Sequence, residues 1–225
     1  MMTPVVNLAI WTLRPDFVAC SIEVRGGRNE AAAGVPFTLA AAGPRPPWAD
    51  DHLAAWRHAY RAFGAKPQRT PCSAEALWRR LQRDGALTSI NAIVDLYNAV
   101  SVRYAVPVGG EDLGAYAGAP QLVRASGVEP FDTIKDGQPA VETVDAGEVV
   151  WRDDRGVTCR RWNWRQTPRT RLEVTSTDMW FVLERLEPMP VDALLEAAAS
   201  LVEGVRRLAP DALITQTLIS ANTAR

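Results

Sequence analysis

Residue types that commonly carry catalytic chemistry are scarce in this sequence. Its 225 residues include three cysteines, Cys20, Cys72 and Cys159, and two histidines, His52 and His58. The cysteines are odd in number, far apart and in no metal-binding spacing, so we expect reduced thiols, a cytoplasmic location and no metal site. The histidines lie six positions apart on a predicted helix and do not share a face, which argues against a paired metal site or a histidine general base.

Long apolar runs and common ligand-binding motifs are also absent. No stretch reaches the ~20 apolar residues of a membrane span, and residues 1–16 lack the basic start and apolar core of a signal peptide. No dinucleotide-binding, Walker, zinc-protease or serine-hydrolase motif occurs. The net charge is −1, and only Lys66 and Lys135 are lysines. We therefore expect no cofactor, no membrane partner and no DNA partner, and any RNA contact must come from a local patch.

The patterning predicts one α+β chain of ordinary globular composition, 47% hydrophobic and 23% charged. Strands are predicted at 5–11, 17–24, 147–152, 157–164 and 211–220, and helices at 50–64, 73–85, 88–104 and 191–209. Residues 109–112, Gly-Gly-Glu-Asp, are predicted to form a flexible turn. Strands and helices without βαβ alternation favour an α+β fold with a mixed sheet.

The segment CRRWNWRQTPRT at 159–170 holds an unusual density of arginine and tryptophan. In an extended strand, alternation would place Arg161, Asn163 and Arg165 on one face and Arg160, Trp162 and Trp164 on the other. The face with an amide between two guanidiniums suits an oxyanion, a phosphate or a carboxylate. The alternative is a structural sheet with tryptophans packed inward and arginines solvated.

Polar residues also mark the helix predicted at 88–104. Asn91, Asp95 and Asn98 fall at i, i+4 and i+7, so they share the face opposite the apolar stripe. A surface helix of this arginine-rich chain should carry charges there. Amides with one aspartate indicate a face that is polar but covered.

Glu184 lies in a predicted strand and shares a face with the apolar Val182 and Leu186. A carboxylate in that setting is expected to be buried and to need a donor partner. An arginine of 160–165 is the expected partner, in a site or in a structural ion pair.

The order of these motifs resembles the tRNA-editing module of the phenylalanyl-tRNA synthetase β chain, formed by its third and fourth B domains. That module has a helix of the form N-x-x-V-D-x-x-N, then a proline, then an aspartate. The matching positions are Asn91, Val94, Asp95, Asn98, Pro107 and Asp112. Segments 122–133, 147–165 and 175–184 follow in the module's order. The resemblance covers about residues 70–205, and stand-alone relatives of the module carry an RRWNWR-type strand.

The resemblance implies a mixed, barrel-like β-sheet flanked by helices. It implies a single domain over 1–225, with N-terminal strands and a helix at 1–69, an editing-module-like core at 70–205 and a C-terminal strand at 206–225. Glu184 falls where the module has a glutamate that reads the hydroxyl of a misattached tyrosine. Gly109 replaces the module's histidine, and Arg160–Arg165 replace its glycine-rich wall. The pocket is therefore expected to be more polar and cationic, and its amino acid need not be tyrosine.

The first hypothesis that follows is a trans-acting aminoacyl-tRNA deacylase, which hydrolyses a mischarged ester with a positioned water. Its transient, weak partner would be tRNA, and a synthetase is a second expected partner. The expected catalytic residues are Arg160, Arg161 and Asn163. The expected substrate-binding residues are Glu184, Asn91, Asp95, Asn98, Trp162, Arg165 and Asp112.

Two alternatives remain open from the sequence. The first is a module that binds RNA, a tRNA 3′ end or an amino acid without turnover, because arginine beside tryptophan also stacks bases. The second is a purely structural role for the arginine–tryptophan segment. That role predicts no pocket between the 88–104 helix and the 157–164 strand.

Overall fold

Two β-sheets pack face to face in the computed structural model, which describes residues 3–222. The larger sheet has the order β1 (Val5–Val6), β6 (Gln121–Arg124), β9 (Val149–Arg152), β10 (Val157–Arg160) and β11 (Arg165–Gln166). The other has the order β13 (Leu213–Ser220), β2 (Val18–Arg25), β12 (Met179–Arg185) and β5 (Val108–Asp112). Short pairs form between β3 (Phe37–Thr38) and β4 (Ala86–Leu87), and between β7 (Pro130–Lys135) and β8 (Gln138–Thr143).

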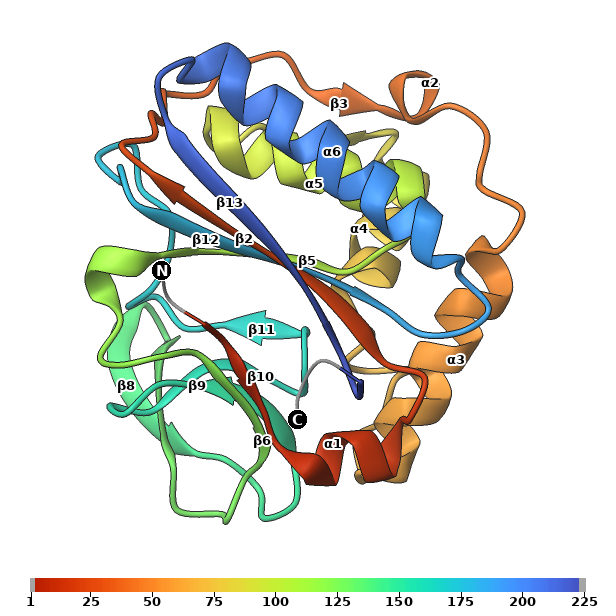
Figure 1. Cartoon of the computed structure of the whole chain (residues 1–225), viewed down its shortest axis with the longest axis vertical. Coiled ribbons are helices and arrows are strands. Elements are labelled where there is room, and N and C mark those ends of the chain that lie inside the picture. The colour runs from red at the N-terminus through yellow and green to blue at the C-terminus, as the bar shows by residue number, and fades with distance from the viewer. Residues whose placement is uncertain (1–2, 223–225) are drawn as a thin grey trace.

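The helices complete a third layer and one flank of the molecule (Figure 1). They are α1 (Leu8–Leu13), α2 (Leu39–Ala42), α3 (Ala49–Ala62), α4 (Ser73–Asp84), α5 (Ala92–Tyr104) and α6 (Val191–Leu208), with a 3₁₀ turn η1 (Leu113–Ala115). Helices α5 and α6 cover the face of the four-stranded sheet that points away from the five-stranded one. None of the helices described at 3–222 is long and apolar enough to cross a membrane.

The expected α+β class is confirmed. Strand β1 runs parallel to β6 while the other pairings are antiparallel, so the larger sheet is mixed. The expectation of a barrel is corrected in one respect, because both sheets remain open over the described residues.

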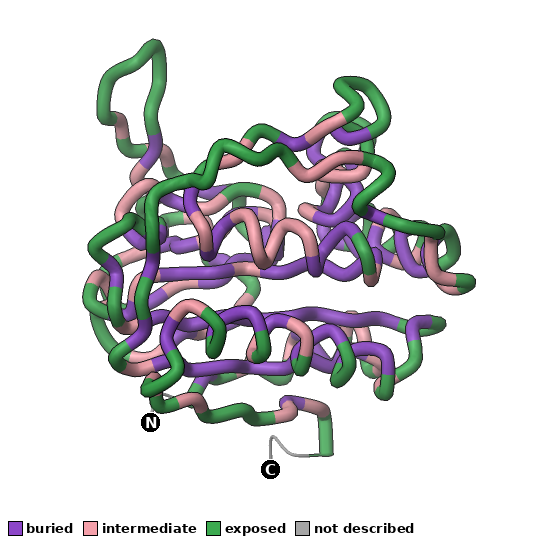
Figure 2. Tube along the Cα trace, turned by 90° about the horizontal axis from the view of Figure 1, so that it is seen from above, coloured by how far each residue is buried: buried purple, intermediate pink, exposed green. Residues whose placement is uncertain are grey.

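Strand β12 explains why the core has two halves. Met179, Phe181 and Leu183 face α5 and α6, while Trp180 and Val182 face the five-stranded sheet. A strand covered on both faces is buried along its whole length. Figure 2 shows the result as continuous buried runs along the central strands, with helices that alternate between buried and exposed sides. Glu184 lies on β12 and is therefore buried by its position in the sheet.

Two predicted strands are wrong in part. Residues 5–11 form a two-residue strand and then α1, because the Asn7 side chain accepts the Ala9 backbone N–H at 2.9 Å and caps the helix. The strand predicted at 157–164 ends at Arg160. Residues 161–164 form the loop of a hairpin that pairs Arg160 with Arg165.

The turn predicted at 109–112 is also wrong, since these residues lie in β5 and pair with β12. Their glycines serve close packing instead. A Cβ on Gly110 would lie 2.8 Å from Cε1 of Tyr97, so only glycine lets α5 approach the strand this closely.

Candidate functional site

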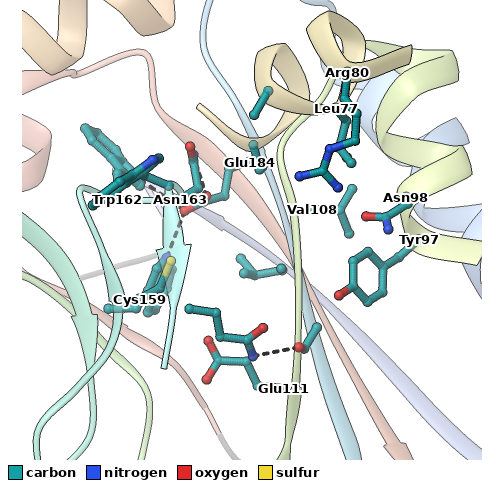
Figure 3. Close-up of a pocket in the computed structure, with 18 residues that line it drawn as sticks. Leu77, Arg80, Tyr97, Asn98, Val108, Glu111, Cys159, Trp162, Asn163 and Glu184 are labelled. Atoms are coloured by element: carbon teal, nitrogen blue, oxygen red, sulfur yellow. Dashed lines mark hydrogen bonds between the residues drawn. The ribbon is translucent and has the colours of Figure 1, made fainter. Parts of the chain in front are cut away.

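A cavity of about 240 Å³ lies between the two sheets and α4. Figure 3 shows side chains from α4, α5, β5, β12 and the 161–164 loop pointing into it. Its lining residues are Ser73, Ala76, Leu77, Arg80, Tyr97, Asn98, Val108, Gly109, Gly110, Glu111, Trp151, Cys159, Trp162, Asn163, Trp164, Gln166, Val182 and Glu184. The cavity lies between α5 and the 157–164 segment, so the prediction of no pocket, made by the purely structural alternative, is wrong.

Glu184 is the most firmly held acid of the cavity, with 1% of its surface exposed. Its Oε1 accepts the indole N–H groups of Trp151 at 3.0 Å and Trp162 at 3.1 Å. Its Oε2 accepts the Asn163 amide at 2.9 Å. Burial raises the pKa of Glu184 to about 7, and these donors offset part of that increase. The predicted burial is confirmed, but the expected arginine partner is replaced by two indoles and an amide.

Glu111 is a second buried acid in the same cavity, 4% exposed, which sequence reasoning placed in a turn. The Tyr116 hydroxyl donates to its Oε2 and lies 3.2 Å from the Thr158 hydroxyl. Burial raises the pKa of Glu111 to about 7, and the Tyr116 hydrogen bond offsets part of that increase. The sequence signal for this strand was two-residue alternation, with Val108, Gly110 and Asp112 on one face and Gly109 and Glu111 on the other. The two glycines obscured it, because adjacent glycines favour a turn.

Helix α4 forms the opposite wall and supplies the cation of the cavity. Ser73, Ala76, Leu77 and Arg80 fall on one helix face at i, i+3, i+4 and i+7. Arg80 is exposed and forms no ion pair or hydrogen bond with another described residue. Figure 3 shows its guanidinium pointing into the cavity. Arginine is common on this helix, so composition alone gave no signal that singled out Arg80.

The 161–164 loop holds its shape through backbone conformations that are rare for large residues. Arg161 has φ 47° and Trp162 has φ 68°, both in the left-handed region. The Trp162 ring is fully buried against Phe17 and Trp56, and its backbone N–H donates to the Val149 carbonyl at 2.6 Å. Burial of that ring stabilises a loop conformation that is locally unfavourable.

Asn163 connects this loop to α3 and β12. Its Oδ1 accepts the Tyr60 hydroxyl at 2.8 Å while its Nδ2 donates to Glu184. The side chain is 7% exposed and both ends are engaged. The structure therefore places Asn163 at the cavity, where it orients Glu184.

The expected catalytic position of Arg160 is corrected. Its Nε and Nη2 donate to the Glu148 carboxylate at 3.1 and 2.8 Å, and its Nη1 donates to Glu142 at 3.0 Å. Arg160 is 8% exposed and does not line the cavity. Strand alternation explains the difference, because Cys159 of β10 lines the cavity while Arg160 points to Glu148, just before β9, and Glu142 of β8.

Arg161 and Arg165 also lie outside the cavity and surround the half-buried Trp164. The Arg161 guanidinium carbon is 4.5 Å from the Trp164 ring centroid, and that of Arg165 is 6.0 Å from it. The expected shared polar face of Arg161, Asn163 and Arg165 does not form, because the loop breaks the strand alternation.

Helix α5 contributes Asn98 to the cavity, but Asn91 and Asp95 have structural positions. Asn91 caps the helix by accepting the Val94 N–H at 2.9 Å. Asp95 accepts the Ile90 N–H at 2.8 Å and the Ser89 hydroxyl. Their expected contact with substrate is therefore corrected, since cap geometry turns both carboxamide and carboxylate back to the chain.

Asp112 is also turned away from the cavity. Its carboxylate accepts the Gly114 N–H at 2.8 Å and the Ser176 hydroxyl, so it caps η1. Within the described residues, no three histidine, cysteine or acidic side chains gather in a metal-binding cluster.

His52 is a structural histidine. It is fully buried, its Nδ1 lies 2.9 Å from the Ala105 carbonyl, and its Nε2 accepts the Trp56 indole N–H at 3.0 Å. Burial lowers the pKa of His52 to about 4, so the ring is neutral near pH 7.

The raised pKa values of Glu111 and Glu184 predict that each carboxyl group contributes less to the free energy of unfolding as the pH rises. Between the ordinary pKa of 4.5 and the folded value of about 7, the folded carboxyl retains a proton that the unfolded chain has released. The contribution is present below pH 4.5 and is lost as the pH rises through 7. We expect Glu111→Gln to gain about 2–3 kcal/mol in unfolding free energy relative to the wild type between pH 4.5 and 7.5. Urea denaturation at both pH values checks this, and a constant difference would contradict it.

Comparison with known proteins finds a matching family and a similar solved structure. The family model described as the B3/4 domain matches residues 55–201. Among solved structures, the chain is similar to an N-terminal fragment of the phenylalanyl-tRNA synthetase β-subunit from Pyrococcus horikoshii, with a TM-score of 0.49 and 9% identity. That similarity covers 96% of this chain and 53% of the other, so the chain spans about half the length of the fragment. No curated protein sequence matches the chain.

The matched range contains the elements that form the cavity, including α4, α5, β5 and β12. It covers more than half of the 225 residues and confirms the resemblance drawn from the order of the motifs. The chain therefore belongs to the B3/4 domain family.

Proposed function

We propose that this protein hydrolyses the ester bond of a mischarged aminoacyl-tRNA. The observation that carries the proposal is the pair of buried carboxylates, Glu111 and Glu184, in one small cavity whose opposite wall presents the unpaired Arg80. A cavity of about 240 Å³ is below the size of drug-sized ligand pockets and suits an amino acid. Membership of the B3/4 family supports an aminoacyl ester as the substrate.

Glu184 is proposed to bind the amino acid. Its three donors fix the carboxylate, and its charged form attracts the α-ammonium or another donor group of the aminoacyl moiety. Asn163 is a positioning residue, because it holds Glu184 and is itself held by Tyr60. Trp162 acts with Asn163 by donating to Glu184.

Glu111 is proposed as the general base, since its pKa of about 7 lies near the operating pH. Its carboxylate takes a proton from water as the water oxygen bonds to the ester carbonyl carbon. The tetrahedral intermediate then breaks its bond to the ribose oxygen, which takes the proton from Glu111. Arg80 stabilises the oxyanion that forms between these steps.

An activated ester makes this chemistry feasible without a histidine or a protein nucleophile. Positioning of water and electrostatic stabilisation of the oxyanion supply much of the rate in such sites.

We propose tRNA as a transient partner, a synthetase as a second partner and the cytoplasm as the compartment. We also propose that 1–225 forms one domain, with 70–205 as its editing core, because Ile10, Trp56 and Ile219 share one hydrophobic cluster.

A non-catalytic binding module is the second candidate. The half-buried Trp164, with the Arg161 guanidinium 4.5 Å from its ring centroid, favours it, because such a pair stacks a base as readily as it borders an ester. Saturable binding of a 3′-terminal nucleotide or an amino acid by calorimetry, with no hydrolysis, would establish this alternative.

A deacylation screen tests the proposed function. We expect the purified protein to hydrolyse one small group among tRNAs charged with each amino acid, correctly and incorrectly. Glu111→Gln should lower the rate by about 10²-fold or more if Glu111 is the base. Glu203→Gln is the matched control, since Glu203 is exposed on α6, away from the cavity. An unchanged rate in Glu111→Gln would remove the base assignment, and no hydrolysis across the panel would favour the binding module.

A further inference from the structure

We propose that a second cavity binds the phosphodiester backbone of the RNA strand whose aminoacylated end enters the Glu184 cavity. The inference rests on the proposed function, which brings that RNA end to the molecule. This basic cavity, of about 560 Å³, is formed by the 63–70 segment after α3, the residues at 145–148 before β9, and Arg161. It is separate from the Glu184 cavity and shares no lining residue with it.

The charge of the basic cavity favours an anion. Lys66 and Arg69 are exposed, and neither forms an ion pair with another described residue. Arg161 is the third cation, with 23% of its side chain exposed, and its Nε lies 3.9 Å from Oε2 of Glu148. The side chains of Lys66 and Arg69 are therefore available to bind an anionic group of a ligand.

The acids of the same cavity do not cancel these cations. Glu148 is 3% exposed and its carboxylate is engaged by the Arg160 fork at 3.1 and 2.8 Å. Asp145 is the other acid, and its side chain is 83% exposed, with Oδ2 4.0 Å from Nη2 of Arg160. Lys66 and Arg69 thus outnumber Asp145, the one acid of the cavity whose carboxylate is not held at hydrogen-bond distance.

The two cavities meet at the 161–164 loop. Trp164 lines the Glu184 cavity, Arg161 lines the basic cavity, and the guanidinium of Arg161 stacks on the Trp164 ring at 4.5 Å. The backbone N–H of Ser73, which follows the basic segment, donates to the Asn163 carbonyl at 3.2 Å. Figure 3 shows Trp162 and Asn163 of this loop at the edge of the Glu184 cavity.

These contacts indicate a path for a single strand. A base next to the aminoacylated nucleotide can stack on Trp164, and the phosphates beyond it then reach Arg161, Lys66 and Arg69. Aromatic stacking combined with a basic groove is how proteins bind single-stranded nucleic acid without reading its sequence. A local basic cavity also explains how a chain of net charge −1 can hold RNA.

RNA binding by the double variant Lys66→Glu/Arg69→Glu tests the inference. The probe is a fluorescent single-stranded RNA with a tRNA-like 3′ end that carries no amino acid. We expect it to bind this variant at least tenfold more weakly than the wild type in low salt. The slope of log affinity against log salt should fall by about 1.4, because each lost phosphate contact contributes roughly 0.7. The matched control is Lys135→Glu/Arg206→Glu, which makes the same charge change at exposed residues of β7 and α6.

The outcomes separate this inference from the proposed function. Three results would overturn the inference. They are no RNA binding by the wild type, an affinity of the double variant within threefold of the wild type, and an equal loss of affinity in the control variant. Hydrolysis of an aminoacyl-adenosine, which carries no phosphate, should be unchanged in the double variant. If no ester is hydrolysed but the binding pattern is as expected, the proposed function fails and the RNA site stands.

Discussion

Replacement of Glu184 by glutamine is expected to lower kcat/KM for aminoacyl-tRNA hydrolysis by about 10²-fold, or about 2.7 kcal/mol of transition-state binding. The substitution retains the shape of the side chain but removes the charge proposed to bind the amino acid. Glutamine can still accept from the two indoles through its oxygen. Rotation of the Asn163 amide would turn an oxygen toward the new NH₂ group and an NH₂ group toward Tyr60. We therefore expect the fold to survive.

Steady-state hydrolysis of the substrate found in the deacylation screen measures the effect. Glu187→Gln is the matched control, because it makes the same chemical change three residues along the chain at an exposed position. Circular dichroism and urea denaturation confirm that both variants are folded. A Glu184→Gln enzyme with kcat/KM within threefold of the wild type would remove Glu184 from the site.

Replacement of Arg160 by alanine is expected to lower the unfolding free energy by about 3–5 kcal/mol. The change leaves the Glu148 carboxylate, 3% exposed, without its bidentate partner. A buried charge that loses its partner is costly, and the donor that Glu148 retains is the Arg161 backbone N–H at 2.9 Å. The Glu142 contact at 3.0 Å is lost as well. Urea denaturation at pH 7 measures the change.

Arg165→Ala is the matched control in the same segment. Arg165 is exposed, lies 6.0 Å from the Trp164 ring centroid and forms no ion pair with a described residue, so we expect a change within about 0.5 kcal/mol. The double variant Arg160→Met/Glu148→Leu should recover much of the lost stability, because it removes both buried charges. A loss below 1 kcal/mol in Arg160→Ala would contradict a structural role for this ion pair.

The positions of the two acids illustrate how far the sequence leads. Alternation along 182–186 placed Glu184 on an apolar face, and the structure confirms its burial. Its partners were beyond the sequence, since Trp151, Trp162 and Asn163 reach it from another sheet and a loop. Glu111 was missed because Gly109 and Gly110 predict a turn by local preference. Pairing with β12 and the close approach of Tyr97 overrode that preference.

The RRWNWR segment shows the same limit in a different form. Its composition indicated a special role, and its strand alternation predicted one polar face. The loop at 161–164 broke that face apart: Asn163 lines the cavity, and Arg161 and Arg165 flank the Trp164 ring. Arg160, just before the loop, forms a buried ion pair instead. Long-range burial of the Trp162 ring stabilises the positive φ values that break the strand, and no local pattern encodes that burial.

The sequence by itself determined the α+β class, the helices that form the outer layer, the family and the burial of Glu184. Each of these depends on periodicity or on the order of motifs along the chain, which the linear sequence contains without its tertiary contacts. The tertiary structure alone decided that Glu111 and Arg80 share the cavity with Glu184. Glu111, Glu184 and Arg80 come from β5, β12 and α4, and only the packing of two sheets and a helix brings them together.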